Sequence, residues 1–485
     1  MKKISFRKVA FIVALFSVAT AIASHAQTFT TLFNFSGING ENPYLGSAIQ
    51  GTDGNFYGTS VSGGKYGYGE IFEIMPTGTL SRTYGFCAEA PVCPDGQTPH
   101  IGLMQAANGN LFGMTAYGGT YNGGTLYALS PSGHFTTLYS FANGTTPQSV
   151  MVQGVNGDLY GTSGNNGKGS YGTIFAVSPT TGTLTTAYTF CSQPACADGT
   201  ASSSLVLAPS GKFYGVTADG GVSQGGTVFE ITPAGKLTTL YGFNSNTDGA
   251  GPSALVLSSN GNFYGTMYEG GTHGGHGSGG TVFEITPAGK FTIIYNFCSQ
   301  VNCTDGELPA GGMVQGSDGN LYGITSLGGF GARHCSLGTM ACGTIFKITP
   351  AGQLTNLYSF CSLPNCVDGT GSSGLVQGTD GSFYGSTDGG GYTGCMCGTF
   401  YSLSVGLGPF VKANPDFGKV GYKINILGNN LTGATNVTFN GMPATFTVVS
   451  NTYIKATVPS GATTGTIEVT TSSSTLFSNV PFQVK

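Results

Sequence analysis

The chain has no tryptophan and very few charged side chains. Charged residues make up 8% of the 485 residues, whereas ordinary domains contain about 25%. The formal net charge is only −4, which excludes a chain that is disordered through charge repulsion. This charge also argues against a nucleic-acid partner, because phosphates demand clusters of Lys and Arg. After residue 23 there is no second long apolar run.

Glycine and aromatic residues are abundant instead. The 83 Gly residues exclude a coiled coil or a large helical bundle, since each Gly inside a helix costs about 1 kcal/mol. The 32 Phe and 24 Tyr residues supply a hydrophobic core. This composition favours a turn-rich, all-β protein.

The N-terminus has the organisation of a secretory signal. Residues 1–8 are basic, the apolar run Val9–Ala23 follows, and Ser24-His25-Ala26 provides a small-x-small cleavage pattern before Gln27. The apolar run is shorter than the ~20 residues needed to span a bilayer, which argues against the alternative of a retained membrane anchor. We therefore expect residues 1–26 to be a signal peptide. The mature protein would be secreted, with an extracellular, periplasmic or cell-surface location and no transmembrane segment.

One repeating unit occupies most of the remaining chain. Its aromatic-Gly step recurs seven times, at Tyr57, Phe112, Tyr160, Tyr214, Tyr264, Tyr322 and Tyr384. Each unit divides into four short strands, a to d, separated by turn sequences. In the fifth unit these strands are predicted at Ala254–Ser258, Asn262–Met267, Thr281–Thr286 and Phe291–Phe297.

Four-stranded units of this length predict a β-propeller, whereas the rungs of the rival β-solenoid are normally shorter. The seventh unit stops after its third strand, Gly398–Leu403, and the missing strand d is found near the N-terminus at residues 29–35. We therefore predict a seven-bladed β-propeller over residues 27–405, whose four-stranded blades are closed into a ring by the N-terminal strand.

The repeat ends near residue 406, and the tail contains short strands rich in β-branched residues. The motifs VTFNGMPATF at 437–446 and IKATVP at 454–459 make residues 406–485 resemble an IPT/TIG immunoglobulin-like domain. This resemblance implies a small β-sandwich that serves as a spacer or adaptor. The repeats resemble the GloVer tandem-repeat family of exported proteins, through DGNFYG at 53–58, GTVF at 226–229 and TPAG at 232–235. That resemblance implies no particular activity.

An even number of cysteines, 12, follows the signal segment, and this is typical of disulfides in an exported protein. The pairs that we predict are Cys87–Cys93, Cys191–Cys196, Cys298–Cys303, Cys335–Cys342, Cys361–Cys366 and Cys395–Cys397. Two alternatives remain for the last four of these loop cysteines, Cys335, Cys342, Cys395 and Cys397. They could exchange partners between units six and seven, or they could form a zinc site with His334.

The b–c and d–a loops carry every cysteine and most of the length variation. Because rigid scaffolds usually place function on variable loops, we expect the functional face there. The candidate ligand-binding residues are Glu269, His273, His276, Arg333, His334, Tyr117 and Tyr392. The histidines lie in glycine-rich loops that fix no metal geometry, so we predict no metal site from them.

An Asp-Gly pair recurs in the d–a loops, at Asp95, Asp198, Asp248, Asp305 and Asp368. These carboxylates suggest a Ca²⁺ site only weakly, because Ca²⁺ takes about six to eight oxygen ligands and a turn explains each Asp-Gly as well. No cofactor and no catalytic residue is predicted. The sequence favours an exported, non-enzymatic recognition or scaffold protein whose loop face binds glycan or protein. The alternative is a polysaccharide-active hydrolase or lyase on the same scaffold.

Overall fold

The structure is a computed structural model that describes residues 27–43, 48–166, 171–272, 279–330, 342–391 and 394–485. The predicted signal peptide lies outside these ranges. The described residues form β-strands and short 3-10 turns, without an α-helix. None of their helical segments has the length and apolarity needed to span a membrane.

Seven antiparallel sheets follow one another along the described residues 28–404. Sheet 1 contains β2 (Ile49–Gln50), β3 (Phe56–Ser60), β4 (Glu70–Ile74) and β5 (Leu80–Gly85). Sheet 2 contains β6 (Met104–Gln105), β7 (Leu111–Met114), β8 (Thr125–Leu129) and β9 (Phe135–Ser140). Sheet 3 contains β10 (Thr145–Pro147), β11 (Val152–Gln153), β12 (Leu159–Asn166), β13 (Thr173–Val177) and β14 (Leu184–Thr189). Sheet 4 contains β15 (Thr200–Leu207), β16 (Phe213–Asp219), β17 (Gln224–Ile231) and β18 (Leu237–Asn244).

The last three sheets repeat this order. Sheet 5 contains β19 (Ala250–Leu257), β20 (Phe263–Glu269), β21 (Thr281–Ile285) and β22 (Phe291–Asn296). Sheet 6 contains β23 (Glu307–Gln315), β24 (Leu321–Leu327), β25 (Thr344–Ile348) and β26 (Leu354–Ser359). Sheet 7 contains β27 (Thr370–Gln377), β28 (Phe383–Gly389), β29 (Thr399–Ser404) and β1 (Thr28–Asn34). The strands of sheet 5 match the predicted strands of the fifth unit to within a few residues.

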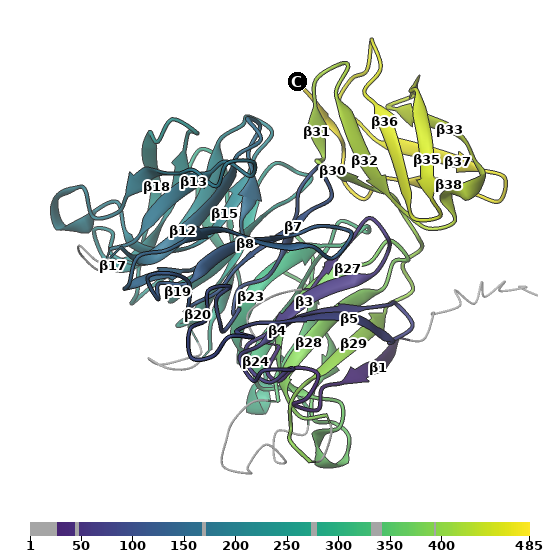
Figure 1. Ribbon diagram of the computed structural model, residues 1–485. Helices are drawn as coiled ribbons and strands as arrows, with labels where there is room; N and C mark the ends of the chain where they lie inside the picture. Colours follow the sequence, from purple (N-terminus) through teal and green to yellow (C-terminus); the bar gives the residue numbers. More distant parts are fainter. Residues whose placement is uncertain (1–26, 44–47, 167–170, 273–278, 331–341, 392–393) are drawn as a thin grey trace, which may run out of the picture.

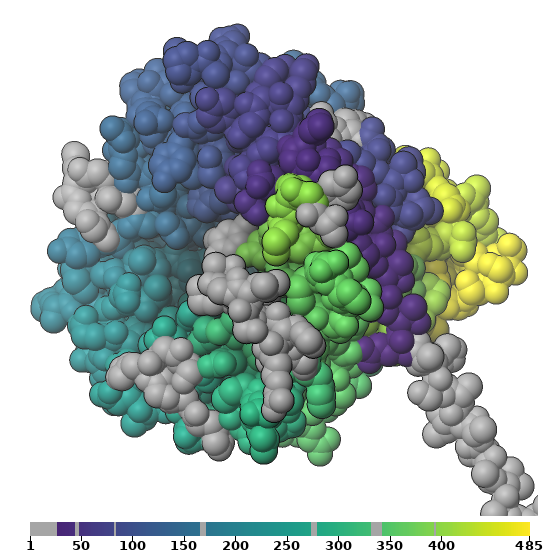
Figure 2. Space-filling model, turned by 90° about the horizontal axis from the view of Figure 1, so that it is seen from below, coloured from purple at the N-terminus to yellow at the C-terminus, as the bar shows by residue number. Residues whose placement is uncertain are grey.

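Strand β1 joins the two ends of the repeat region. It runs antiparallel to β29, in a register that pairs Thr28 with Ser404 and Asn34 with Thr399. The two strands lie side by side in Figure 1. In Figure 2, the purple N-terminal part of the disc adjoins the green part near residue 400. The prediction that residues 29–35 supply the missing strand of the last unit is confirmed.

Seven hydrophobic clusters lie between successive sheets. The cluster between sheets 7 and 1 contains Phe56, whose ring centroid lies 4.0 Å from that of Tyr384. Phe35, directly after β1, packs in the same cluster against Phe72, with centroids 5.2 Å apart. The N-terminal segment is therefore part of the core and covers the edge of β29, which would otherwise invite aggregation.

A chain of glutamine side chains connects the a–b turns of neighbouring sheets. The Gln at the end of strand a accepts a hydrogen bond from a backbone N–H in the a–b turn of the preceding sheet, at 2.8–3.1 Å. The acceptors are Gln50, Gln105, Gln153, Gln315 and Gln377, and their donors are Thr379, Thr52, Ala107, Ser259 and Ser317 respectively. The Gln50–Thr379 contact links sheet 1 to sheet 7, so these bonds also run across the point where the chain ends meet.

The C-terminal residues form two sheets that pack face to face. One sheet has the order β30 (Lys412–Asn414), β32 (Lys423–Leu427), β36 (Tyr453–Thr457), β35 (Phe446–Ser450). The other has the order β34 (Met442–Pro443), β33 (Ala434–Phe439), β37 (Ile467–Thr471), β38 (Thr475–Phe477). A parallel pair, β31 (Phe417–Gly418) and β39 (Gln483–Val484), completes the domain. Its core contains Val437, Ile454 and Val469, as alternating β-branched residues predict.

The C-terminal domain contacts the a–b turns of the ring of sheets. The Thr452 hydroxyl donates to the Thr52 carbonyl at 2.9 Å, and the Asn425 amide donates to the Ala107 carbonyl at 3.0 Å. The Asn429 amide donates to the Thr379 hydroxyl at 3.0 Å. The domain thus sits on the end of the ring opposite to the b–c and d–a loops (Figure 1).

Replacement of Phe35 by alanine tests the role of the N-terminal segment in this core. Because Phe35 is fully buried, we expect Phe35→Ala to lower the free energy of unfolding by about 3–5 kcal/mol. The matched control is Phe297→Ala, which removes the equivalent buried ring of sheet 5, packed on Phe346 at 5.1 Å. Urea unfolding of both variants gives the comparison. A stability loss for Phe297→Ala without one for Phe35→Ala would contradict ring closure.

Candidate functional site

The b–c and d–a loops of the seven sheets are together called the loop face. Since the C-terminal domain contacts the a–b turns, it leaves this face uncovered. Figure 2 views the ring from the side opposite to the C-terminal domain, whose yellow atoms project from behind the disc. The structure therefore places the most variable loops on a free end of the ring.

Disulfides close the d–a loops. The bonded pairs are Cys87–Cys93, Cys191–Cys196, Cys298–Cys303 and Cys361–Cys366. A fifth disulfide joins Cys395 to Cys397 in a b–c loop. These are five of the six pairs that the sequence predicts. Each short covalent loop limits the conformations of the unfolded chain and so stabilises the fold.

The remaining pair falls partly outside the described residues. Cys342 is disulfide-bonded, while Cys335, the partner predicted for it, is outside the described ranges. The alternative of a zinc site needs free thiolates. It is wrong for Cys342, Cys395 and Cys397, because all three are oxidised.

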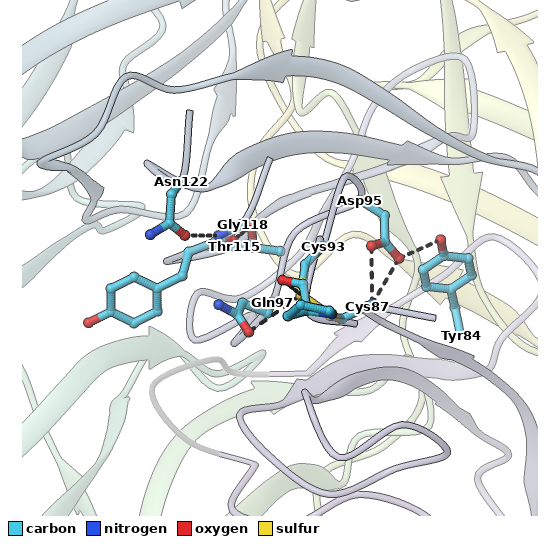
Figure 3. Close-up of a disulfide and its surroundings, with 10 residues drawn as sticks. Tyr84, Cys87, Cys93, Asp95, Gln97, Thr115, Gly118 and Asn122 are labelled. Carbon is cyan, nitrogen blue, oxygen red and sulfur yellow. Dashed lines mark hydrogen bonds between the residues drawn. A yellow bond between two sulfur atoms is a disulfide. The ribbon is translucent and has the colours of Figure 1, made fainter. Parts of the chain in front are cut away.

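The five Asp residues of the d–a loops organise their own loops. In sheet 5, the buried Asp305 carboxylate accepts hydrogen bonds from the Tyr295 hydroxyl at 2.8 Å and from the Ser299 N–H at 2.9 Å. In Figure 3, Asp95 lies between the Tyr84 hydroxyl and the Cys87 N–H, each 3.1 Å from a carboxylate oxygen. These carboxylates thus hold the loop, and the turn interpretation is confirmed by the Gly306 N–H, which donates to the Cys303 carbonyl at 2.9 Å.

The weak Ca²⁺ suggestion gains no support from this arrangement. Each carboxylate points into its own loop toward tyrosine and backbone donors, so the five carboxylates do not converge on a common point. Within the described ranges, no three His, Cys, Asp or Glu side chains are close enough to hold a metal ion.

Acidic residues of strand c also serve the scaffold. The Glu230 carboxylate accepts from the Tyr214 hydroxyl at 2.6 Å and pairs with the Lys212 ammonium at 2.7 Å. The Glu284 carboxylate accepts from the Tyr264 hydroxyl at 2.8 Å. Because these contacts recur at matching positions of different sheets, they mark the repeat and not a catalytic pair.

Two of the candidate ligand-binding residues lie within the described ranges. Glu269 is half-buried at the end of β20. The Tyr117 side chain is 51% exposed, and its backbone forms two hydrogen bonds with Gln97, at 2.9 and 3.2 Å, that hold the loop. The other candidates, His273, His276, Arg333, His334 and Tyr392, lie outside the described residues.

The loop face carries an exposed apolar rim, of whose members only Tyr117 is among the residues predicted from the sequence. In or beside its loops, large hydrophobic side chains are exposed at Ile38, Tyr66, Val92, Tyr117, Tyr121, Tyr171, Val222, Tyr268, Val301, Phe330, Leu363, Val367 and Met396. Elsewhere in the described part of the ring, only Met75, Val150 and Val155 are comparably exposed. Several aliphatic members, such as Val222 and Val301 at 82%, lie at loop tips, where water contact is costly unless a partner covers them.

One buried acid departs from the repeat. Directly after the recurring Gly of strand c, the other six sheets have Thr, as in Gly226-Thr227, and sheet 1 has Glu70. The Glu70 side chain is 1% exposed, and one of its carboxylate oxygens has no hydrogen-bond partner among the described residues. The neighbouring Ser60 hydroxyl also has none. Burial raises the pKa of the Glu70 carboxyl to about 7.

The comparisons with known families agree with the repeat pattern. The family model of the Gloeobacter/Verrucomicrobia repeat matches residues 15–206, 192–393 and 274–441. The chain belongs to this repeat family. The model of the IPT/TIG domain matches residues 410–484, so both predicted resemblances are confirmed. Among proteins with curated descriptions, none matches the sequence significantly.

Solved structures with similar folds include propeller proteins of low sequence identity. An oligogalacturonate lyase from Vibrio parahaemolyticus aligns with a TM-score of 0.50 and 8% identity, over 78% of this chain and 96% of that chain. The extracellular domain of a one-component system from B. thetaiotaomicron aligns with a TM-score of 0.49 and 10% identity, over 94% of this chain and 59% of that chain. At such identity, the lyase shows a shared propeller-like fold and nothing of its activity.

The buried Glu70 carboxyl predicts a defined pH dependence of stability. Its pKa is about 7 in the folded state, against an ordinary value of 4.5, so the folded chain binds more protons than the unfolded chain between these pH values. Stability should therefore fall as the pH rises through this window. Gln stays neutral at every pH. The free energy of unfolding of Glu70→Gln, relative to that of the wild type, should therefore rise by about 2–3 kcal/mol between pH 5 and pH 8.

Urea unfolding at both pH values measures this difference. Glu89→Gln, which alters an exposed acid, is the matched control and should show no such gain. Equal effects of Glu70→Gln at pH 5 and pH 8 would contradict a carboxyl that is buried as the neutral acid.

Proposed function

We propose that this protein is an exported recognition protein that binds a glycan on the loop face of a closed seven-bladed β-propeller. In this proposal residues 27–405 form the propeller, residues 406–485 form the adaptor domain, and residues 1–26 direct export. The seven sheets, the cluster between sheets 7 and 1, and the Gln50–Thr379 contact support the closed ring. The disulfides fit an extracellular protein.

The observation that carries the binding proposal is the apolar rim of the loop face. Exposed apolar groups concentrate on one end of the ring, and this end is the one that the C-terminal domain leaves free. Soluble proteins rarely concentrate exposed apolar side chains in this way unless the surface contacts a partner. The disulfides and the buried Asp carboxylates stiffen the loops beneath the rim, which lowers the entropy lost on binding.

The aromatic members of the rim favour a glycan. Tyr66, Tyr117, Tyr121 and Tyr171 present flat rings with a polar edge, at 38–62% exposure. Such rings can stack on the apolar faces of sugars while their hydroxyls form hydrogen bonds. A protein partner would use the same rim, and the test below separates the two.

Catalysis has no comparable support. A glycosidase needs two carboxyl groups flanking one bond, whereas the recurring acids of the described residues are bound to tyrosine, lysine and backbone donors. A polysaccharide-active enzyme on this scaffold therefore stands only as an outcome of the test.

The test is a glycan microarray, followed by calorimetry with the best ligand. Combined replacement of Tyr117 and Tyr121 by alanine should weaken binding at least about tenfold, because truncation of an aromatic anchor typically costs more than 1 kcal/mol. Phe477→Ala is the control, since this side chain is 52% exposed on the C-terminal domain, and it should bind as the wild type does.

Three results would contradict the proposal. Binding to no glycan, together with retention of a protein ligand, would identify the rim as a protein-binding surface. If the Tyr117/Tyr121 variant bound the glycan as tightly as the wild type, the glycan site would lie elsewhere on the protein. Release of shorter fragments from the bound glycan would establish an enzyme.

A further inference from the structure

A cavity lies at the end of the ring opposite to the loop face, between the axis and the C-terminal domain. Its volume is about 650 Å³, within the range of about 300–1,000 Å³ that is usual for small-molecule sites. No part of it belongs to the loop face. The cavity exists because the C-terminal domain bridges the a–b turns without entering the axis of the ring.

The ring side of this cavity is mostly aliphatic, although Gln50, Gln105, Gln153 and Gln315 also line it. Strand a is the innermost strand of each sheet, and its side chains turn toward the axis. The wall side chains from six of the sheets are Ile49, Met104, Val152, Val256, Val314 and Val376. In sheet 4, the remaining sheet, Leu207 lines the cavity. Such a wall favours the hydrocarbon part of a ligand over water.

The cap of the cavity carries charge. Strand β30 turns Ala413 into the core of the C-terminal domain, so Lys412 and Asn414 point the other way, toward the ring. The Asn414 amide donates to the Gln105 carbonyl at 3.2 Å, which fixes β30 over the innermost strands. Lys412 and Asp416 both line the cavity.

Lys412 lacks a direct counter-ion. Among the described residues, its ammonium forms no salt bridge, and the charge that acts on it is the more distant Asp416 carboxylate. The Lys412 side chain is exposed, so its ammonium is open to the cavity and can pair with an anion that enters there. Lys423, on the neighbouring strand β32, also lines the cavity, so two ammonium groups face one carboxylate, that of Asp416.

We propose that this cavity binds a small amphiphile, whose hydrocarbon chain lies along the aliphatic wall and whose single anionic head group pairs with the Lys412 ammonium. A carboxylate or sulfonate head would form a charge-assisted hydrogen bond with Lys412. This pair would supply the counter-ion that the chain itself lacks. The mostly apolar wall and the excess of ammonium groups thus favour a fatty or aromatic acid over a sugar or a peptide.

Calorimetry with dodecanoate, below the concentration at which it forms micelles, tests the site. The full-length mature protein should bind one molecule per chain. Lys412→Met should weaken binding at least tenfold, and dodecanol, which lacks the charge, should bind the wild type at least tenfold more weakly than dodecanoate. Lys455→Met is the matched control, because Lys455 is exposed on β36 of the same domain, and it should bind as the wild type does.

A second variant covers the case in which Lys412→Met does not fold. Val314→Phe places a larger side chain in the wall and should abolish binding while urea unfolding still shows a folded protein. The inference is overturned if wild-type protein shows no saturable binding. It is also overturned if Lys412→Met and Val314→Phe bind dodecanoate as tightly as the wild type, since the ligand would then occupy another surface such as the loop face. The tyrosine variants of the loop face should keep full dodecanoate affinity, so this test and the glycan test can fail independently.

Discussion

The pairing of β1 with β29 is the constraint on which the rest of the structure depends. A row of sheets has two open ends, and each open end exposes unpaired backbone groups and one face of a hydrophobic cluster. Here the first strand of the chain completes the last sheet, and Phe35 then fills the cluster between sheets 7 and 1. The Gln50–Thr379 hydrogen bond crosses the same junction. Only when these contacts form do the seven innermost strands surround one axis.

This closure gives the molecule two ends with different properties. At one end, the a–b turns are short and polar, and their carbonyl groups receive side-chain donors from the C-terminal domain. At the other end, disulfides and buried Asp carboxylates hold loops whose apolar tips face water. The domain that caps the first end therefore leaves the second end free, and it bounds a cavity that Lys412 and Lys423 both line. The proposed glycan site on the loop face and the proposed amphiphile site in the cavity thus lie at opposite ends of the ring.

Much of the fold could be predicted from the sequence because each strand and turn pattern occurs in several copies that can be compared. Seven copies of the aromatic-Gly step placed the strands, and the truncated seventh unit pointed to the strand at residues 29–35. Cysteines a few residues apart in matching loops indicated their partners. The Asp-Gly series was correctly interpreted as turns, since the glycines after Asp198 and Asp305 each donate to the carbonyl three residues earlier.

Contacts between neighbouring units, and surfaces that several units form together, were not predicted. The recurring Gln at the end of strand a is visible in five units, but its acceptor role toward the preceding turn appears only in the ring. Glu70 could have been found by alignment of the units, because it stands where the others have Thr. The aliphatic members of the rim and the cavity at Lys412 require the three-dimensional arrangement. The histidines and Arg333 of the candidate site lie outside the described residues, so their contribution stays a prediction.

The most direct test of the closed ring is a cross-link between β1 and β29. Thr30 and Ser402 face each other in this pairing, and directly opposed residues of antiparallel strands have Cβ atoms about 4.5–5.5 Å apart, close enough for a disulfide after a small adjustment. Peptide mass spectrometry without reduction should show nearly complete bonding in a Thr30→Cys/Ser402→Cys variant. A Thr30→Cys/Thr185→Cys variant, whose second cysteine lies on sheet 3, should keep both thiols free. Free thiols at residues 30 and 402 in the folded protein would contradict the closed ring.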